Sequence, residues 1–414
     1  MLRRCWFALA FASIAALGTS LGGSSAVGQD KKPDEKKPID DKKAADDKKA
    51  IDDKKADDKK MEDKKAEDKK AEDKAKGAIE PEDQSFKSAD GVKLVGKLYK
   101  TPKGAAPVVL MLHDYKANPN ETVWEDTAQT LAKAGYNVFR FDFRGHGKSL
   151  DVVPGEFWLR PENKNLINLG GVNPSVKSTI KFTEFKQNYY PMLVQDIAAA
   201  RNVIDQLNDN GTVNASTIYL LGAGDSAGLG MLYLASEWSR ERQKPNVGVV
   251  AQYVSPNRPL FPTAEPAGGD FGGAVWLSPT RHISMTQANL KDWVLSPRTI
   301  NLRTETAMLF IHGEKDAKSA PMAKFLYRDA LMVDAKSNPS NGQKLLHPDQ
   351  TFIREIKGSA AAGAKLLGNN LGTEDMVEKF LKAVDGERKS KTRKTREWDK
   401  PLFIEVTAFG VCRS

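Results

Sequence analysis

A serine between small residues is the first side chain in this sequence that could do covalent chemistry. Ser226 stands in Gly224-Asp225-Ser226-Ala227-Gly228, which matches the pattern Gly-x-Ser-x-Gly. A neutral serine hydroxyl is a weak nucleophile and needs an adjacent general base. The chain has five histidines that could supply one: His113, His146, His282, His312 and His347. A working serine nucleophile therefore requires the fold to bring an imidazole to Ser226.

Three carboxylates offer a second kind of chemistry. Asp114, Asp225 and Asp316 each follow an apolar run that reads as a strand, so they should gather at one edge of a sheet. Such a group could hold a metal ion, but no histidine stands at a fixed ligand spacing from them, and we predict no metal site. We also predict no cofactor, because Gly222-Ala223-Gly224 lacks the third glycine of a dinucleotide-binding loop.

The elements that must position these residues alternate between strands and helices. Apolar runs predict buried strands at 107–112, 138–141, 217–221, 274–277, 307–311 and 351–356. Apolar residues at helical spacing predict helices at 124–131, 193–207, 227–237 and 376–384. Two segments at 85–88 and 92–99 flank Ala89-Asp90-Gly91 and predict a hairpin. This order predicts an α/β fold: a mostly parallel twisted sheet with helices on both faces and an antiparallel N-terminal edge hairpin.

Two stretches interrupt the alternation. Residues 150–189 and 243–273 are long, poorly periodic and rich in Gly, Pro and Asn. Loops of this length in a compact domain are usually lids or binding loops. Because both follow strands, we expect them over the carboxyl edge of the sheet, where ligands bind in this architecture.

The residues at three strand ends resemble the α/β-hydrolase superfamily of esterases, lipases and serine peptidases, over residues 86–383. The segment Phe141-Asp142-Phe143-Arg144-Gly145-His146-Gly147-Lys148-Ser149 resembles that family's strand-4 exit. Leu112-His113-Asp114 resembles its His-Gly oxyanion loop, with Asp114 in place of the glycine. His312-Gly313-Glu314-Lys315-Asp316 resembles the loop that carries its acid. The resemblance implies the α/β-hydrolase fold, Ser226 and Asp316 as candidate catalytic residues, and an oxyanion pocket at Asp114, Gly224, Asp225 and Ala227.

The register around the serine leaves two interpretations. In the family the nucleophile turn opens with the glycine that closes the apolar strand, here Gly222, and counting from it puts Gly224 at the nucleophile position. Gly224 would then take a positive φ without a Cβ clash, and Ser226 would lie in the first turn of the helix with its hydroxyl on the backbone. Placing Ser226 at the apex instead requires a strand two residues longer, and a strained positive φ at Ser226.

The general base is the harder problem. In the family it is a histidine after the last strand, in the order Ser, acid, His. Here the loop after that strand reads Lys357-Gly358-Ser359-Ala360-Ala361-Ala362-Gly363, and no histidine follows His347. His347 could serve only if the last strand is misplaced. We interpret the remaining four as structural (His113, His146, His312) or solvated (His282). Loss of the base forfeits about 10²–10⁴ in rate, so we expect a degenerate triad.

The N-terminal region predicts export. Arg3 and Arg4 precede an apolar segment at 6–17, and Ala26-Val27-Gly28 offers a cleavage site, so residues 1–28 resemble a signal peptide. An uncleaved membrane anchor is the alternative. Cys5 lies in the signal and Cys412 near the end, which excludes an internal disulfide in the mature chain. We expect a periplasmic, envelope-associated or secreted protein without a transmembrane span after cleavage.

The rest of the chain divides into three parts. Residues 29–84 form an Asp/Lys-rich spacer predicted to be disordered, with 18 Lys and 17 acidic residues between Asp30 and Lys76. Residues 85–386 form the α/β domain. Residues 387–414 form a basic tail, expected to be a solvated linker followed by a short strand at 402–406 that packs on the domain edge. Without residues 1–76 the net charge is +6, a mild excess that does not mark a nucleic-acid binder, so we predict no nucleic-acid partner.

Two functional hypotheses follow, and they leave open whether the chain is an enzyme. The first is an exported α/β-hydrolase-fold protein with a degenerate triad, a non-catalytic or weakly active pseudoenzyme that binds a small-molecule or envelope ligand. The alternative is an active serine hydrolase, cleaving a carboxylic ester or peptide bond with Ser226 as nucleophile and Asp316 as acid. A third hypothesis, an adhesin whose charged spacer contacts cell wall or another charged surface, gives the domain no chemical role.

Overall fold

The structure is a computed structural model that describes residues 77–116, 122–240, 266–296, 299–332, 351–388, 392–396 and 402–406. The chain divides into two units, 1–76 and 77–414, and every described residue belongs to the second. The predicted signal peptide, nearly all of the spacer, most of the second excursion and His347 lie outside the described residues.

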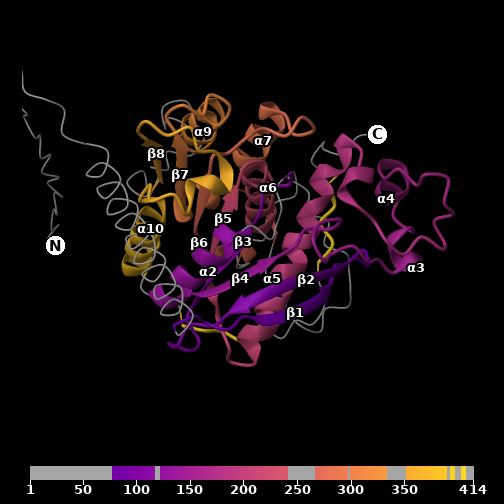
Figure 1. Ribbon diagram of the computed structural model, residues 1–414, viewed down its shortest axis with the longest axis horizontal. Coiled ribbons are helices and arrows are strands. Elements are labelled where there is room, and N and C mark those ends of the chain that lie inside the picture. The colour runs from indigo at the N-terminus through magenta and orange to yellow at the C-terminus, as the bar shows by residue number, and fades with distance from the viewer. Residues whose placement is uncertain are drawn as a thin grey trace, which may run out of the picture. The chain divides into compact units, whose positions relative to one another are not determined.

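The centre of the described unit is an eight-stranded sheet in the order β1-β2-β4-β3-β5-β6-β7-β8 (Figure 1). The β1–β2 and β2–β4 pairs are antiparallel and the other pairs are parallel. This confirms the predicted mostly parallel sheet with its N-terminal hairpin. The strands are β1 Glu82–Lys87, β2 Lys93–Tyr99, β3 Pro107–Leu112, β4 Asn137–Phe141, β5 Asn214–Ala223, β6 Phe271–Leu277, β7 Ala307–Gly313 and β8 Thr351–Ile356.

Helices cover both faces of the sheet. On one face α2 and α10 bury their apolar residues against alternate residues of the central strands; on the other, α5 and α6 do the same. None of the described helices has both the length and the apolar composition to cross a membrane. The main helices are α2 Thr122–Ala134, α5 Val194–Asp209, α6 Ser226–Ser239, α7 Gln287–Val294, α8 Ile300–Glu305, α9 Ser319–Lys324 and α10 Thr373–Arg388.

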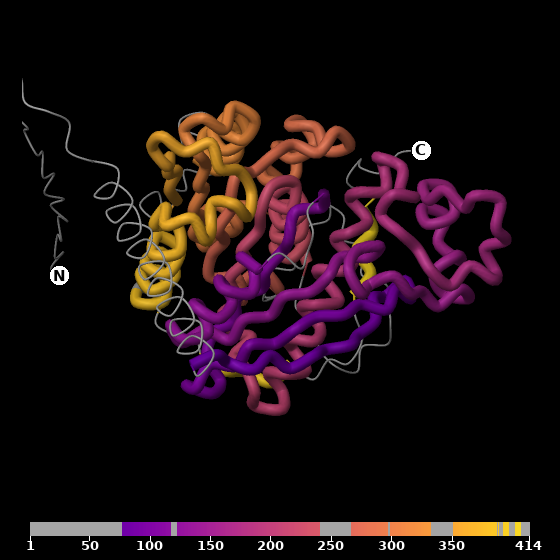
Figure 2. The backbone as a smooth tube through the Cα atoms, viewed as in Figure 1, coloured from indigo at the N-terminus to yellow at the C-terminus, as the bar shows by residue number. Residues whose placement is uncertain are grey.

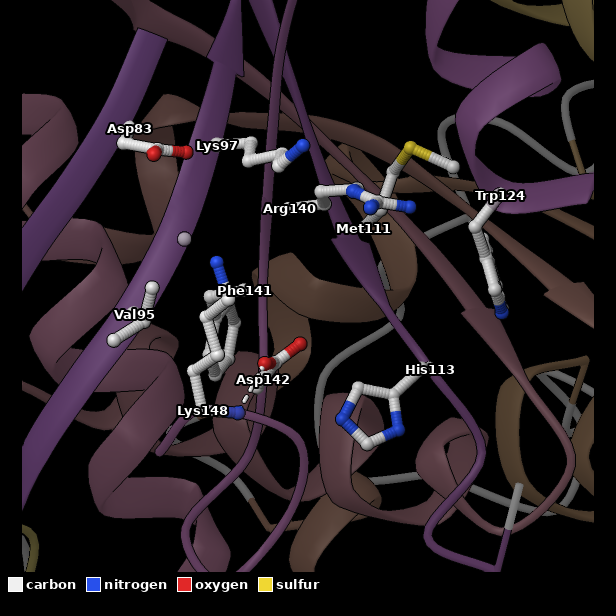
Figure 3. Close-up of a pocket in the computed structure, with 11 residues that line it drawn as sticks. Asp83, Val95, Lys97, Met111, His113, Trp124, Arg140, Phe141, Asp142 and Lys148 are labelled. Atoms are coloured by element: carbon white, nitrogen blue, oxygen red, sulfur yellow. Dashed lines mark hydrogen bonds between the residues drawn. The ribbon is translucent and has the colours of Figure 1, made fainter. Parts of the chain in front are cut away.

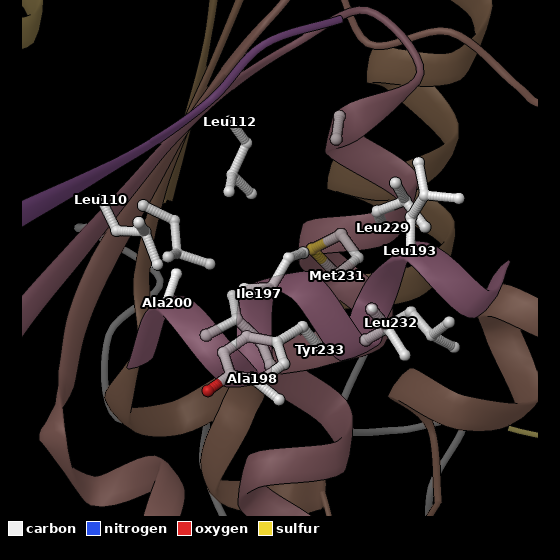
Figure 4. Packing of buried hydrophobic residues seen from close by; sticks show 14 of the residues in the cluster. Leu110, Leu112, Leu193, Ile197, Ala198, Ala200, Leu229, Met231, Leu232 and Tyr233 are labelled. Carbon is white, nitrogen blue, oxygen red and sulfur yellow. The ribbon is translucent and has the colours of Figure 1, made fainter. Parts of the chain in front are cut away.

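The core beneath α5 and α6 shows why the site's backbone is rigid. Leu110 and Leu112 of β3 face Ile197 of α5 and Leu229 of α6, all of them fully buried (Figure 4). All residues of α6 are buried, as are all residues of β5. Each fully buried aliphatic side chain contributes about 1.5–3 kcal/mol, so the strand and helix that flank Ser226 are held on every side.

The first excursion, residues 150–189, contains short helices where the sequence predicted only loop. These are α3 Pro154–Phe157, α4 Pro161–Leu166, and the 3₁₀ turns η1 Phe182–Glu184 and η2 Gln187–Leu193. α3 and α4 each begin with proline, which fits the first helical turn because its missing N–H is not needed there. The excursion lies at the opposite end of the domain from α10 (Figure 2). It packs on the loop after β4, where Phe182 stacks on His146 with ring centroids 4.6 Å apart.

A buried cluster of charges ties this excursion to the sheet and to α5. The guanidinium of Arg144, after β4, donates to Asp90 in the hairpin turn at 2.7 Å and to Asp196 of α5 at 2.8 Å. It also donates to the hydroxyl of Tyr189 at 2.9 Å. Asn163 of α4 donates to the same Asp90 carboxylate. The side chains of the three charged residues are fully buried, so each ionic group depends on the others for its hydrogen bonds.

The basic tail docks on the domain, contrary to the prediction of a solvated linker. Arg396 donates to Asp270 at 2.9 Å, and Arg393 donates to the carbonyl of Asn208 at 2.6 Å. Residues 402–406 pack on the domain edge as predicted, with both backbone groups of Ile404 bonded to the Gln195 side chain. They do not form the predicted strand, because their backbone pairs with a side chain rather than with a neighbouring strand.

Candidate functional site

The turn between β5 and α6 has its apex at Gly224. This residue has a φ of +56°, the conformation predicted for a glycine at the nucleophile position. β5 extends to Ala223, two residues past the predicted end at Leu221, yet the turn does not move with it. The amide of Gly224 donates to the carbonyl of Leu277, and its carbonyl accepts from the amide of Thr280. The turn is therefore fixed to β6 and to the loop that follows β6.

The sheet order and this strand–turn–helix unit together decide the architecture. The parallel strands run in the order β4, β3, β5, β6, β7 and β8, with the sharp turn at the carboxyl end of β5. The chain has the α/β-hydrolase fold.

The Asp114 side chain lies directly against the apex glycine. A Cβ built on Gly224 would lie 1.5 Å from Oδ2 of Asp114 and 2.5 Å from its Cγ. The domain therefore combines a glycine at the apex of the turn with a carboxylate from the loop after β3 that is directed at it.

Backbone amides hold the Asp114 carboxylate in place. The amide of Lys116 donates to it at 2.9 Å, and the amide of Asp225, the residue after the apex, also donates to it. In the α/β-hydrolase fold the amide after the nucleophile is an oxyanion-hole donor. Burial raises the pKa of Asp114 to about 6, and the nearby Asp225 charge adds to the shift.

Ser226 lies at the start of α6 and points away from the turn. Its side chain is fully buried, its φ is not positive, and its hydroxyl donates to the carbonyl of His113. The sequence predicted a hydroxyl bonded to backbone, and this is observed, but the partner is a carbonyl acceptor rather than a free helix amide. No described histidine nitrogen forms a hydrogen bond with it. Ala227, the next candidate pocket residue, is fully buried among the core side chains.

Asp225 is surrounded by groups that the sequence did not indicate. The hydroxyl of Thr280 donates to its carboxylate, and the hydroxyl of Tyr190 donates to its carbonyl. His282 stacks on Tyr190 with ring centroids 3.8 Å apart, and Tyr115 meets His282 edge-on at 5.7 Å. No sequence pattern indicated this cluster.

His282 corrects an expectation, because the sequence predicted a solvated imidazole. The residue is only 7% exposed, and its Nδ1 lies 2.7 Å from the Ser284 hydroxyl. Burial lowers the pKa of His282 to about 4, although the Asp225 charge opposes the shift. The imidazole is therefore neutral at physiological pH. The stacking on Tyr190 could not be read from the sequence because the two residues come from different loops.

The other described histidines have structural partners. Nε2 of His113 accepts from the Phe143 amide at 3.0 Å, and burial together with His146 lowers the pKa of His113 to about 3. Nε2 of His146 lies 2.7 Å from the Tyr115 carbonyl, and Nδ1 of His312 lies 3.0 Å from the Gly313 carbonyl. These contacts agree with the structural roles expected for all three.

The loop after β8 reaches the apex but brings no base. A Cβ built on Gly363 would lie 3.9 Å from Oδ2 of Asp114. The carbonyls of Ser359 and Ala361 pack against Gly313 at the end of β7. The loop therefore follows the path expected of a base-carrying loop, with alanines and glycines along it.

Asp316 is engaged in capping a helix. Its carboxylate accepts from the Ser319 hydroxyl at 2.5 Å and from the amides of Lys318 and Ser319 at 3.3 Å each, at the start of α9. The structure thus brings Asp114, Gly224 and Asp225 together and uses Asp316 elsewhere. Among the described residues no group of three or more His, Cys, Asp or Glu side chains is arranged to hold a metal ion.

Comparison with known proteins gives the following. No protein-family model matches the chain, and no curated protein matches it. Among solved structures, an esterase of Pyrococcus furiosus is 16% identical, with 75% of this chain and 93% of that chain covered and a TM-score of 0.42. A dienelactone hydrolase of Anabaena variabilis is 15% identical, with 74% and 98% covered and a TM-score of 0.39. Est1E of Butyrivibrio proteoclasticus is 12% identical, with 73% and 99% covered and a TM-score of 0.41.

Proposed function

We propose that this protein is a non-hydrolytic α/β-hydrolase-fold protein that is exported and binds a small-molecule or envelope ligand. The observation that carries the proposal is the carboxylate of Asp114 at the apex of the β5–α6 turn. It occupies the space of a nucleophile side chain and accepts the backbone amide that would stabilise a reaction oxyanion.

Electrostatics at the turn also oppose acyl transfer. An oxyanion hole works because its donors are free and aimed at the site where negative charge develops. Here the donor of Asp225 is already bonded to a carboxyl group, and the Asp114 and Asp225 charges lie close enough to interact. A developing oxyanion would meet negative charge rather than free donors, so the transition state would be destabilised.

The alternative, a serine hydrolase with Ser226 and Asp316, has little support in the contacts of either residue. The Ser226 hydroxyl proton is directed to the His113 carbonyl, where no base can remove it. The Asp316 carboxylate accepts from the Lys318 amide and from the amide and hydroxyl of Ser319 at the start of α9. Activating Ser226 would require breaking its hydrogen bond and moving a fully buried side chain.

A fluorophosphonate probe tests the proposal on the full chain. We expect no labelling of the wild type, and the same result for Ser226→Ala and for the matched control Ser236→Ala. Ser236 lies on the same helix, is fully buried and bonds the Tyr233 carbonyl. Labelling of the wild type that disappears in Ser226→Ala but persists in Ser236→Ala would establish the hydrolase instead.

Export is tested separately by the mass and location of the mature chain. The proposal expects a chain that begins after Gly28 and is recovered outside the cytoplasm. A chain that keeps residues 1–28 and is recovered in the membrane fraction would establish the anchored alternative. Binding of the purified spacer region to cell-wall material would favour the adhesin.

A further inference from the structure

A cavity of about 120 Å³ lies on the face of the sheet that α2 covers (Figure 3). Its walls come from β2, β3, β4 and α2, with contributions from Asp83 of β1 and Lys148 of the loop after β4. Since one water needs only about 10–15 Å³ of such space, the cavity has room for several waters or for one small organic molecule.

The register of the sheet explains how charged groups come to line it. Asp83, Lys97, Arg140 and Met111 are successive partners across β1, β2, β4 and β3, so they form one row on one face. Two residues after Arg140 and Met111, Asp142 and His113 continue the same face of the sheet. Side chains two residues apart on a strand share a face. The lining of the cavity therefore contains the cationic groups of Lys97 and Arg140, and Lys148 of the loop after β4 adds a third.

Two buried donors in this lining have no acceptor. Nη1 of Arg140 and Nε1 of Trp124 are both inaccessible to solvent and form no hydrogen bond in the described part of the chain. The other terminal nitrogen of Arg140 lies 3.4 Å from the Glu125 carboxylate, so the guanidinium keeps one edge unused. Buried donors are nearly always satisfied, and a free guanidinium edge together with an indole N–H suits an oxygen-rich acceptor.

Among the described residues, the acceptors nearby are bonded to other donors. Nε2 of His113 already accepts from the Phe143 amide, and the Asp142 carboxylate accepts from the Lys148 amide at 2.8 Å. Asp83 lies at the exposed rim. The remaining wall includes the apolar side chains of Met111 and Val95.

We propose that this cavity binds a small carboxylate with a short apolar tail, its oxygens accepting from Arg140 and Trp124. Arg140 is suited to the role because a guanidinium edge matches a carboxylate in geometry and charge. A carboxylate is favoured over phosphate because a single negative charge is repelled less by Asp142 and because the tail can cover the apolar wall. The site is independent of the turn and does not rest on the absence of hydrolysis.

Titration calorimetry of the full chain with propionate tests the proposal, with uncharged propionamide and inorganic phosphate as comparison ligands. We expect saturable binding of propionate with a Kd at or below about 1 mM, and weaker binding of both others. Absence of saturable propionate binding would overturn the proposal. So would propionamide or phosphate binding as tightly as propionate.

Variants locate the binding. Arg140→Gln should weaken propionate at least about tenfold, and Trp124→Phe, which keeps the ring and removes only the N–H, about three- to tenfold. Lys93→Met is the matched control, because Lys93 is an exposed residue of β2 outside the cavity lining and should leave binding unchanged. If Arg140→Gln does not fold, the affinity of Trp124→Phe for propionate decides whether the cavity is the binding site. Wild-type affinity in a folded Trp124→Phe or Arg140→Gln variant would show that the cavity is not the site.

Discussion

The loop after β3 contributes to two polar regions, which differ in whether their buried polar groups have hydrogen-bond partners among the described residues. On one side, Asp114 fills the β5–α6 turn, and the neighbouring Arg144 cluster has a partner for each of its charges. On the other side, His113 lines a cavity in which Arg140 and Trp124 keep free donors. Two adjacent residues of one loop thus belong to different regions. Asp114 places its carboxylate in the β5–α6 turn, and His113 lines a cavity where two donors have no acceptor among the described residues.

The difference teaches where this α/β-hydrolase domain has room for a ligand. The turn is the usual position for chemistry in the fold, yet here a side chain of the protein occupies it. Two donors without an acceptor among the described residues, Nη1 of Arg140 and Nε1 of Trp124, belong instead to the lining of the cavity on the face that α2 covers. The presence of a cation does not distinguish the two regions, because each contains an arginine. Arg144 belongs to the first region, and Arg140, four residues earlier in the chain, belongs to the second. The two regions differ in the partners of the arginine: Arg144 pairs with buried carboxylates, whereas the nearest carboxylate of Arg140 belongs to the partly exposed Glu125.

Replacing each arginine by methionine should give the largest contrast. Arg144→Met leaves the buried carboxylates of Asp90 and Asp196 without their cation, which should cost about 3–5 kcal/mol of unfolding free energy. Arg140→Met removes only a long ion pair to a partly exposed Glu125 and should cost less than about 1 kcal/mol. Urea unfolding measures both. Equal losses would show that Arg140 is as fully engaged as Arg144.

Adding a methyl group at the apex should disturb the first region by a smaller amount. Gly224→Ala places a Cβ against Asp114 and imposes a positive φ on alanine, which should cost about 3 kcal/mol. Asp114→Gly in the same chain should recover part of this, with a coupling of about 1–2 kcal/mol in a double-mutant cycle. Gly228→Ala is the control, because a Cβ there meets only Met285 at 3.8 Å and should be nearly neutral. Additive losses for Gly224→Ala and Asp114→Gly would mean that the two residues do not compete for one space.

The smallest expected effect is a pH dependence from Asp114. Its pKa rises from an ordinary value near 3.8 to about 6 because of burial, so the folded state holds the proton more tightly than the unfolded state. Stability from this group is therefore fully present below pH 4 and is lost as the pH rises through 6. Asp114→Asn should remove this slope between pH 4 and 7 in unfolding measurements. An unchanged slope in the variant would assign the pH dependence to other groups.

Much of the fold could be predicted from the sequence because it follows from apolar periodicity. The strand at 107–112 and the helical face from 193 to 207 are continuous signals that tertiary contacts did not override. The glycine apex could be predicted too, since the apolar run before Gly222 sets the register. The helices α3 and α4 were missed because they are short, begin with proline and lack an apolar stripe.

The contents of the site could be predicted only in part. Asp114 was identified as an unusual residue in its loop, but its overlap with Gly224 is a relation between two segments 110 residues apart. The stacking of His282 on Tyr190 and the free donors of Arg140 and Trp124 are relations of the same kind. No local pattern encodes them, because each depends on which loops the sheet order brings together.

The docked tail has a consequence for how the domain is made. Gln195 and Asp270 receive partners from Ile404 and Arg396, which lie 209 and 126 residues further along the chain. During synthesis every strand and helix described above is complete before those partners leave the ribosome. A chain that stops short of residue 392 lacks the contacts of Ile404 with Gln195 and of Arg396 with Asp270, although Asp270 keeps its ion pair with Arg201. Residues 392–406 therefore add their contacts only after the sheet and its helices have been synthesised.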